Sequence, residues 1–321
     1  MIFLHFNNLE TFFGGLAYQR YLPMLIQYFR KRNAKFMSYS EFPGFDKINE
    51  DIVMTGREDL NYDTLIEGVK FLNEYKLNNY KFKLYYLASD IWPRYDSIFT
   101  NAQETIIKAT NYKLIHVMMD TDHLAYLWSY RFNLKNYLHN FINFQYNYYY
   151  DGIIVDLNPN PINKILLSGN SAPSLYPERH YLKSLNLPEI TVLPFIQFSD
   201  YTNTLNKYLC AIVTGVASID PVTGQSVNAK CLLLKYLEVL GSGALLLVDN
   251  SIEKELEALG LKHKDNCYVS SLSNIKETVQ YITNMANRDE IDRIRLNGQN
   301  FYKDYKLRQD EKIHEVFKDL V

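Results

Sequence analysis

The chain has 321 residues, a formal net charge of -2 and a sequence pI near 6.4. Its length favours two domains, because one hydrophobic core rarely serves more than about 250–300 residues. The near-neutral charge excludes a strongly basic surface for nucleic acid. The lack of an apolar run of about 18 residues excludes a transmembrane segment. Three scattered cysteines indicate a reducing, cytoplasmic compartment.

Short apolar strands alternate with helical stretches in the first half of the chain. The alternation predicts a parallel, doubly wound sheet. A first helix follows Gly14-Gly15 and ends near residue 32, and Pro23 either kinks it or begins a second segment. The other predicted helices span 63–75, 97–109 and 124–144, and the strands span 2–6, 51–54, 82–87, 112–118 and 152–155.

Residues 156–163 interrupt this alternation with two prolines and three asparagines, which is typical of a linker. We therefore expect an N-terminal Rossmann-like domain over 1–160 and a C-terminal one over 161–321. In the second half, strands are predicted at 164–168, 190–193, 209–214, 244–248 and 267–269. Helices are predicted at 175–185, 230–240, 252–259, 274–286, 289–302 and 308–320.

The most informative segment is an apolar helix that stops at Gly241-Ser-Gly243 and continues into an apolar strand ending at Asp249. The pattern predicts the α–β half of a βαβ unit. The helix carries one carboxylate, Glu238. That side chain is either a solvated residue on a core helix or a group that accepts hydrogen bonds from ribose hydroxyls.

Three loops follow predicted strands and precede helices, where backbone N–H groups can meet an anion. Gly14 and Gly15 form the first, although a glycine pair is also ordinary turn chemistry. The loop 167–179 contains Ser171 and ends at Arg179, whose planar fork suits phosphate oxygens. The loop 214–229 begins with Thr214-Gly215 and suits either a phosphate or base pocket, or a plain surface loop.

Several motifs of the second half together resemble the nucleotide-sugar domain of GT-B glycosyltransferases, most closely the group-1 (CgeB-like) branch. They are Tyr176-Pro-Glu-Arg179, Lys235-Tyr-Leu-Glu238, Ser242-Gly-Ala-Leu-Leu246 and Asp265-Asn-Cys-Tyr268. The resemblance covers residues 164–321. It implies two Rossmann-like parallel-sheet domains facing a central cleft, with a C-terminal helix that crosses back to the first domain. The first half matches in architecture only.

The resemblance also implies roles for individual residues. Glu238 is expected to bind the ribose of the donor, while Arg179 and Lys235 neutralise the leaving diphosphate. The N–H groups of Gly243 and Ala244 are expected near the donor. No cofactor or metal is expected, since cations and helix dipoles take the place of a divalent ion. Lys230 stands where retaining relatives carry a second glutamate, so inverting and retaining mechanisms both stay open.

An inverting enzyme needs a general base near the acceptor hydroxyl. The candidates are Asp120, Asp122 and His123, which follow a predicted strand; Asp122 also suits the N-cap of the next helix. The expected function is transfer of a hexose or pentose from a nucleotide-diphosphate donor to a glycan or glycoconjugate acceptor, as in glycan biosynthesis. The alternatives are a GT-B-fold sugar-nucleotide epimerase and an inactive module that binds a glycan or a partner.

Overall fold

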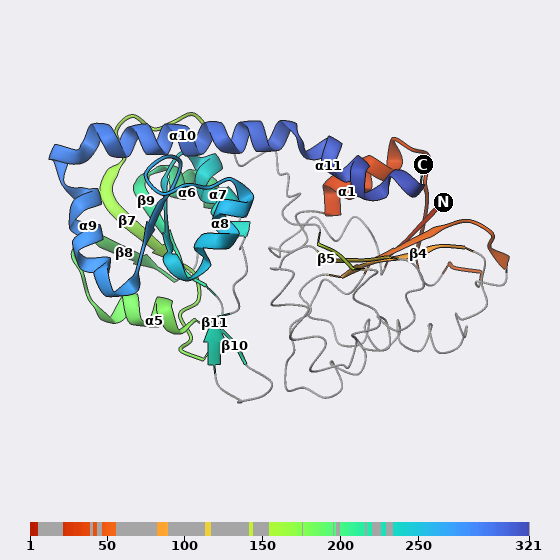
Figure 1. Cartoon of the computed structure of the whole chain (residues 1–321), viewed down its shortest axis with the longest axis horizontal. Coiled ribbons are helices and arrows are strands. Elements are labelled where there is room, and N and C mark those ends of the chain that lie inside the picture. The colour runs from red at the N-terminus through yellow and green to blue at the C-terminus, as the bar shows by residue number, and fades with distance from the viewer. Residues whose placement is uncertain are drawn as a thin grey trace. The chain divides into compact units, whose positions relative to one another are not determined.

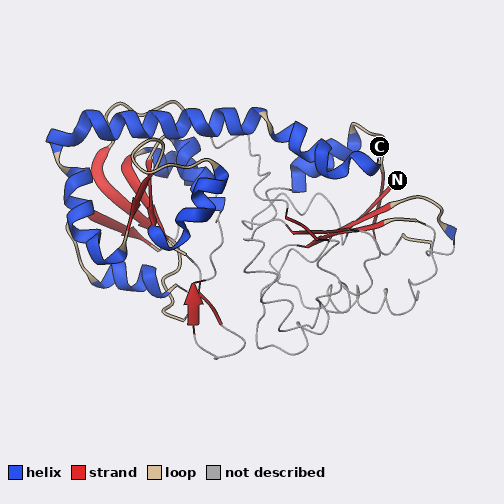
Figure 2. Ribbon diagram, viewed as in Figure 1, coloured by secondary structure: helices blue, strands red, loops and turns tan. Residues whose placement is uncertain are grey.

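Two separate parallel β-sheets, one in each of two units, form the framework of the protein (Figures 1 and 2). Unit 1 comprises Met1–Tyr149, Ile219–Gly224 and Gln309–Val321, and unit 2 comprises Tyr150–Ser218 and Gln225–Arg308. The computed structural model describes residues 1–5, 22–38, 41–43, 47–55, 82–88, 113–116, 141–143, 154–174, 176–194, 196, 200–215, 217–219, 226–228 and 234–320.

The sheet of unit 1 has the strand order β2-β1-β3-β4-β5-β6, and all neighbouring strands are parallel. The strands are β1 (Ile2–His5), β2 (Lys35–Ser38), β3 (Ile52–Thr55), β4 (Leu84–Ala88), β5 (Lys113–His116) and β6 (Phe141–Asn143). The strands predicted near β1, β3, β4 and β5 are confirmed. Strand β2 escapes prediction because it is a partly exposed edge strand with two apolar residues in four.

The helix predicted over 124–144 is wrong at its end, where Phe141–Asn143 forms β6 and pairs with β5. Aromatic and β-branched residues there favour a strand, but a three-residue strand is too short to show its period. The rest of that helix, and the helices predicted at 63–75 and 97–109, lie outside the described residues.

Helix α1 (Leu22–Arg30) and helix α11 (Gln309–Phe317) belong to the same unit, so the end of the chain returns to unit 1. Pro23 is the second residue of α1, where its missing N–H costs no helical bond. The Phe317 ring meets that of Phe29 edge-on, with centroids 5.0 Å apart, and the Tyr28 hydroxyl lies 3.2 Å from Nδ1 of His314. The expected return of the last helix to the first domain is confirmed.

The sheet of unit 2 has the order β13-β12-β9-β7-β8, again with all neighbours parallel. Numbered along the chain, this is the doubly wound order 2-1-3-4-5, whose topological switch point lies between its first and third strands, here β7 and β9. The strands are β7 (Ile162–Ser168), β8 (Ile190–Leu193), β9 (Tyr208–Val213), β12 (Leu245–Asp249) and β13 (Tyr268–Ser270), all five near their predicted positions.

Helices enclose this sheet, with α10 on one side and α5 on the other in Figure 1. At Gly298 of α10 an added Cβ would lie 2.8 Å from Cδ2 of Leu240 on α7, so glycine permits close packing there. None of the described helices is long and apolar enough to cross a membrane. The α-helices are α5 (Pro177–Ser184), α6 (Tyr201–Asn206), α7 (Leu234–Ser242), α8 (Glu253–Leu259), α9 (Ile275–Thr283) and α10 (Arg288–Leu307). Short 3₁₀ turns span Asn250–Ile252, Leu272–Asn274, Met285–Asn287 and, in unit 1, Lys318–Leu320.

Some elements of unit 2 differ from prediction. The described part of the strand expected at 152–155 has no regular structure. Strands β10 (Ala217–Ile219) and β11 (Ser226–Asn228) form a two-stranded sheet within the segment expected to be a loop. Helix α6 was not predicted, because six residues are too few to show a helical hydrophobic period. Helix α7 passes through Gly241 and ends at Ser242, after which Gly243 adopts φ +76°.

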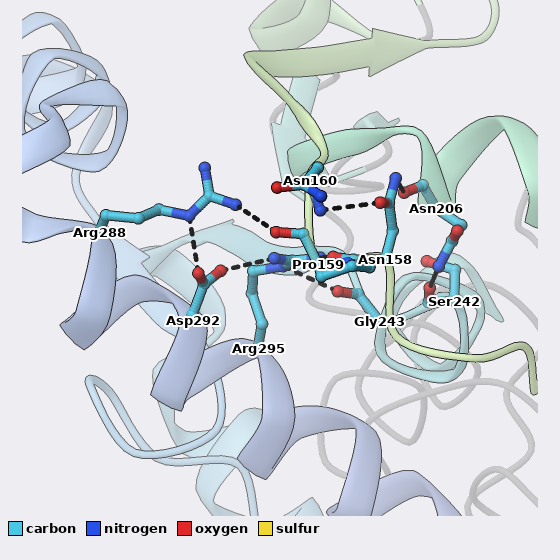
Figure 3. A network of polar contacts seen from close by, with 9 residues as sticks. All are labelled: Asn158, Pro159, Asn160, Asn206, Ser242, Gly243, Arg288, Asp292 and Arg295. Atoms are coloured by element: carbon cyan, nitrogen blue, oxygen red, sulfur yellow. Dashed lines mark hydrogen bonds and ion pairs between the residues drawn. The ribbon is translucent and has the colours of Figure 1, made fainter.

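The proline-asparagine linker is held against unit 2 by a network of polar contacts, which Figure 3 shows from close by. Arg295 of α10 is 1% exposed and donates to the carbonyls of Gly243 (2.9 Å) and Asn158 (3.0 Å). Asn206 donates to the Ser242 carbonyl at 2.7 Å. The carbonyl of Val155, which directly precedes the linker, accepts a 2.8 Å hydrogen bond from Gln299, also on α10. The described part of the linker is therefore an integral part of unit 2.

Candidate functional site

Polar and charged side chains of unit 2 gather where β7 and β9 end, at the switch point of the sheet. Strand β7 ends at Ser168 and leads into Gly169-Asn170, while β9 ends at Val213 and leads into Thr214-Gly215. Open α/β sheets bind ligands at the carboxyl ends of their strands, outside this point. The side chains that converge here come from α5 and α7.

Gly169 shows most directly how closely two of these groups approach. A Cβ atom at this position would lie 2.8 Å from Nζ of Lys235 and 3.0 Å from Nη1 of Arg179, and the residue has φ +104°. The left-handed backbone favours glycine, and a side chain here would have to displace the ends of Lys235 and Arg179. Arg179 and Lys235, which we call the cation pair, meet above Gly169.

Arg179 lies in the first turn of α5 and is 4% exposed. Its Nη1 donates to the Asn170 carbonyl at 2.6 Å, and its guanidinium carbon lies 4.3 Å from the centre of the Tyr176 ring. Burial lowers the pKa of the guanidinium, but arginine stays charged at neutral pH. Four neighbours oppose the shift: Tyr176, Tyr201, Tyr236 and Glu178.

Lys235 reaches the same point from the first turn of α7. Its Nζ donates to the Ser168 carbonyl at 3.1 Å and lies 5.9 Å from the centre of the Tyr201 ring. The two backbone carbonyls that flank Gly169 thus each hold one member of the cation pair. The structure brings together two residues that the sequence resemblance assigned to one diphosphate.

The loop after β9 forms the other side of the switch point. Thr214 is 1% exposed, and its hydroxyl has no hydrogen-bond partner among the described residues. Gly215 is buried, and its N–H donates to Oε2 of Glu178 at 2.9 Å. The sequence singled out Gly215 but neither the Thr214 side chain nor Glu178. The only available signal was their place at a strand end and in the first turn of a helix.

Glu238 lies one turn beyond Lys235 on α7 and is 2% exposed. The interpretation of Glu238 as a solvated side chain on a core helix is therefore wrong, because α7 is buried on every side from Tyr236 onward. A buried carboxylate is expensive unless polar groups surround it. Its position on the helix that also carries Lys235 is compatible with a binding role.

Gly243 and Ala244, which were expected near the donor, lie apart from the cation pair. They precede β12, whereas the cation pair lies where the parallel strands end. The Gly243 N–H donates to the Leu240 carbonyl at 3.1 Å and the Ala244 N–H to Oγ of Ser242 at 3.3 Å. Both N–H groups therefore serve the turn between helix and strand.

The remaining predicted residues divide into two sets. Ser171 lies in the loop after β7, next to an Asn170 side chain that accepts the Ala172 N–H at 2.9 Å. The others lie outside the described part of the chain: Gly14, Gly15, Asp120, Asp122, His123 and Lys230. Within unit 2, the described groups can bind an anion, because two cations and a buried hydroxyl lie at the switch point.

No protein-family model and no curated protein sequence matches the chain. Solved structures do match over its whole length. One is the β-glucosyltransferase of T4 phage solved with UDP and Mn²⁺, at 12% identity, 99% coverage of both chains and a TM-score of 0.57. Another is Anabaena HepE in complex with UDP-glucose, at 12% identity, 100% coverage of both chains and a TM-score of 0.55.

Sucrose-phosphate synthase from Thermosynechococcus elongatus is also similar, at 8% identity, with 100% of this chain and 99% of that chain covered and a TM-score of 0.53. These structural neighbours are GT-B glycosyltransferases, and together with the two parallel sheets they show that the chain has the GT-B fold. At such low identities the likeness extends to the fold alone.

Proposed function

We propose that this protein is a glycosyltransferase that binds a nucleotide-diphosphate sugar in unit 2 and transfers the sugar to a hydroxyl of a glycan or glycoconjugate. The observation that carries the proposal is the cation pair, which meets above Gly169 at the switch point of a GT-B fold. The motifs shared with the CgeB-like branch support the same class.

The cation pair suits a leaving diphosphate. Negative charge grows on the diphosphate as the bond to the sugar breaks, and fixed cations in a poorly solvated site stabilise that charge in the transition state. Arginine has five N–H donors, and the bond to the Asn170 carbonyl uses one of them. Two cations held by backbone carbonyls need no reorganisation when the charge develops. We therefore propose that transfer proceeds without a divalent metal.

Glu238 is the proposed partner of the ribose hydroxyls. Its carboxylate is buried, and in a buried site a charge-assisted hydrogen bond to a ribose hydroxyl is stronger than one in water. A Glu238→Gln substitution keeps the shape and removes the charge. We expect it to weaken UDP binding while the melting temperature stays close to that of the wild type; unchanged affinity would remove Glu238 from the donor site.

The first half of the chain is proposed to bind the acceptor. If the reaction inverts the anomeric centre, Asp120, Asp122 or His123 supplies the general base. We propose a uridine diphosphate sugar as the first donor to test, because the T4 phage enzyme was solved with UDP and HepE with UDP-glucose.

The test is a calorimetric titration of the purified protein with UDP, GDP, ADP and CMP in the presence of EDTA. Mass analysis of products follows, with the matching nucleotide sugar and a mixed set of glycan acceptors. The proposal predicts selective binding of one nucleoside diphosphate and release of that diphosphate when an acceptor is glycosylated. Absence of binding to every nucleotide would overturn it, and a strict metal requirement would overturn the metal-independent mechanism.

A further inference from the structure

Glu178 stands at an unusual place for an acidic residue beside a proposed phosphate site. It lies in the first turn of α5, directly before Arg179, and its side chain is partly buried. A carboxylate in the first turn of a helix is stabilised by the helix dipole. However, a carboxylate so close to the cation pair also repels a bound diphosphate. The position of Glu178 therefore needs an explanation.

The reason lies in the contact that Glu178 makes. Its Oε2 accepts the N–H of Gly215 at 2.9 Å, which joins α5 to the loop after β9. Hydrogen bonds to a charged acceptor are stronger than those between neutral groups. The bond is tertiary, linking residues far apart in the sequence, and the Gly215 backbone that it fixes is buried.

Adjacent residues of α5 thus hold both sides of the switch point. Arg179 binds the loop after β7 through the Asn170 carbonyl, and Glu178 binds the loop after β9 through the Gly215 N–H. Strands β7 and β9 are neighbours in the sheet. One turn of one helix therefore contacts both loops.

Thr214 gives a second, independent reason to regard the loop after β9 as part of a binding site. Its hydroxyl is buried and lacks a hydrogen-bond partner in the described part of the protein. A buried polar group left in this state is costly, and a bound ligand relieves the cost. The unsatisfied hydroxyl directly precedes the N–H that Glu178 holds.

We propose that Glu178 is a positioning residue of the donor site, which holds the Thr214-Gly215 turn at a fixed distance from the cation pair. The inference rests on the donor site proposed above. Glu178 touches neither the sugar nor the leaving group in this account. It acts through the Gly215 backbone, to which its side chain presents an acceptor oxygen.

The test compares Glu178→Ala, Glu178→Gln and a control, Glu277→Ala. Glu277 is an exposed carboxylate in the first turn of α9, so its removal reproduces the lost helix-dipole contact elsewhere in unit 2. UDP affinity is measured by calorimetry, amide hydrogen exchange is followed in the peptide that contains Gly215, and donor KM and kcat are determined once an acceptor is known.

Glu178→Ala is expected to weaken UDP binding about tenfold and to speed exchange at Gly215, because the loop loses its anchor. Its donor KM rises while kcat changes little. Glu178→Gln keeps an acceptor oxygen and is expected to stay within about threefold of the wild type, as is the Glu277→Ala control.

Unchanged or tighter UDP binding by Glu178→Ala overturns the inference, since tighter binding would mean that the carboxylate occupies the place of the ligand's anion. Failure of Glu178→Gln to restore affinity also overturns it, even if Glu178→Ala does not fold. These results are distinct from failure of the proposed function: if the wild-type protein binds no nucleoside diphosphate, both proposals fall together.

Discussion

Replacing Gly169 with alanine places a methyl group at the point where the cation pair meets. The new Cβ would lie 2.8 Å from Nζ of Lys235 and 3.0 Å from Nη1 of Arg179. The lysine end is flexible and can retreat, but the arginine is held by a 2.6 Å hydrogen bond to the Asn170 carbonyl. The substitution therefore displaces at least one cation from its position.

Two effects of this substitution can be separated. The left-handed backbone at φ +104° costs an alanine about 1–2 kcal/mol of stability. Displacing one cation removes a charge-assisted contact of about 1.5–3 kcal/mol, so UDP affinity is expected to fall about tenfold or more. Denaturation measures the first effect and calorimetric titration of UDP the second.

Gly260→Ala is the matched control, because Gly260 caps α8 at φ +98° and faces the ring of Phe301, with the added Cβ 3.1 Å from Cε2. It is expected to lose a similar amount of stability and to bind UDP like the wild type. If Gly169→Ala bound UDP as tightly as Gly260→Ala, the convergence of the cation pair on the ligand would be refuted.

Further predictions concern the body of unit 2. Arg295→Met leaves the buried Gly243 carbonyl and the partly buried Asn158 carbonyl without this donor and is expected to lower the free energy of unfolding by about 2–3 kcal/mol; a loss near zero on urea denaturation would show that the linker network adds no stability. Gly298→Ala brings a Cβ within 2.7 Å of the Asn266 carbonyl and is expected to cost about 1–3 kcal/mol by overpacking, and a wild-type melting temperature would contradict this. Burial raises the pKa of Cys267 to about 12 and also raises that of Cys210. Raised values keep both thiols protonated near about pH 8, so peptide mapping should find them alkylated by iodoacetamide only after unfolding, and labelling of the native protein would contradict their burial.

The sequence was most informative where apolar patterns were long and continuous. The runs 209–213 and 244–248 are fully apolar, as expected for parallel strands buried on both faces, and the strands predicted at 209–214 and 244–248 are confirmed as β9 and β12. The short elements β2, β6 and α6 were not predicted, because none of them contains more than two consecutive apolar residues.

The site was predictable as a set of residue types but not as a geometry. Motifs singled out Arg179 and Lys235, yet nothing in the sequence shows that both side chains meet above Gly169, since that depends on the packing of α5 and α7 against β7. The bond between Glu178 and Gly215 is hidden for the same reason.

The positions of Gly243 and Ala244 follow from the topology of the fold. A motif match assigned them to the donor, whereas the direction of the chain places them elsewhere. A turn that leads from a helix into a parallel strand lies at the amino end of that strand, opposite the edge where ligands bind.

Arg179 is proposed to help bind the diphosphate of a nucleotide, and a titration of UDP and uridine tests this role most directly. Three proteins are compared: the wild type, Arg179→Ala, and Lys183→Ala, which removes an exposed cation from the same helix. The wild type and Lys183→Ala should both bind UDP far more tightly than uridine. In Arg179→Ala, the ratio of the Kd for uridine to the Kd for UDP should fall at least about tenfold. An undiminished preference for UDP in Arg179→Ala would contradict the account.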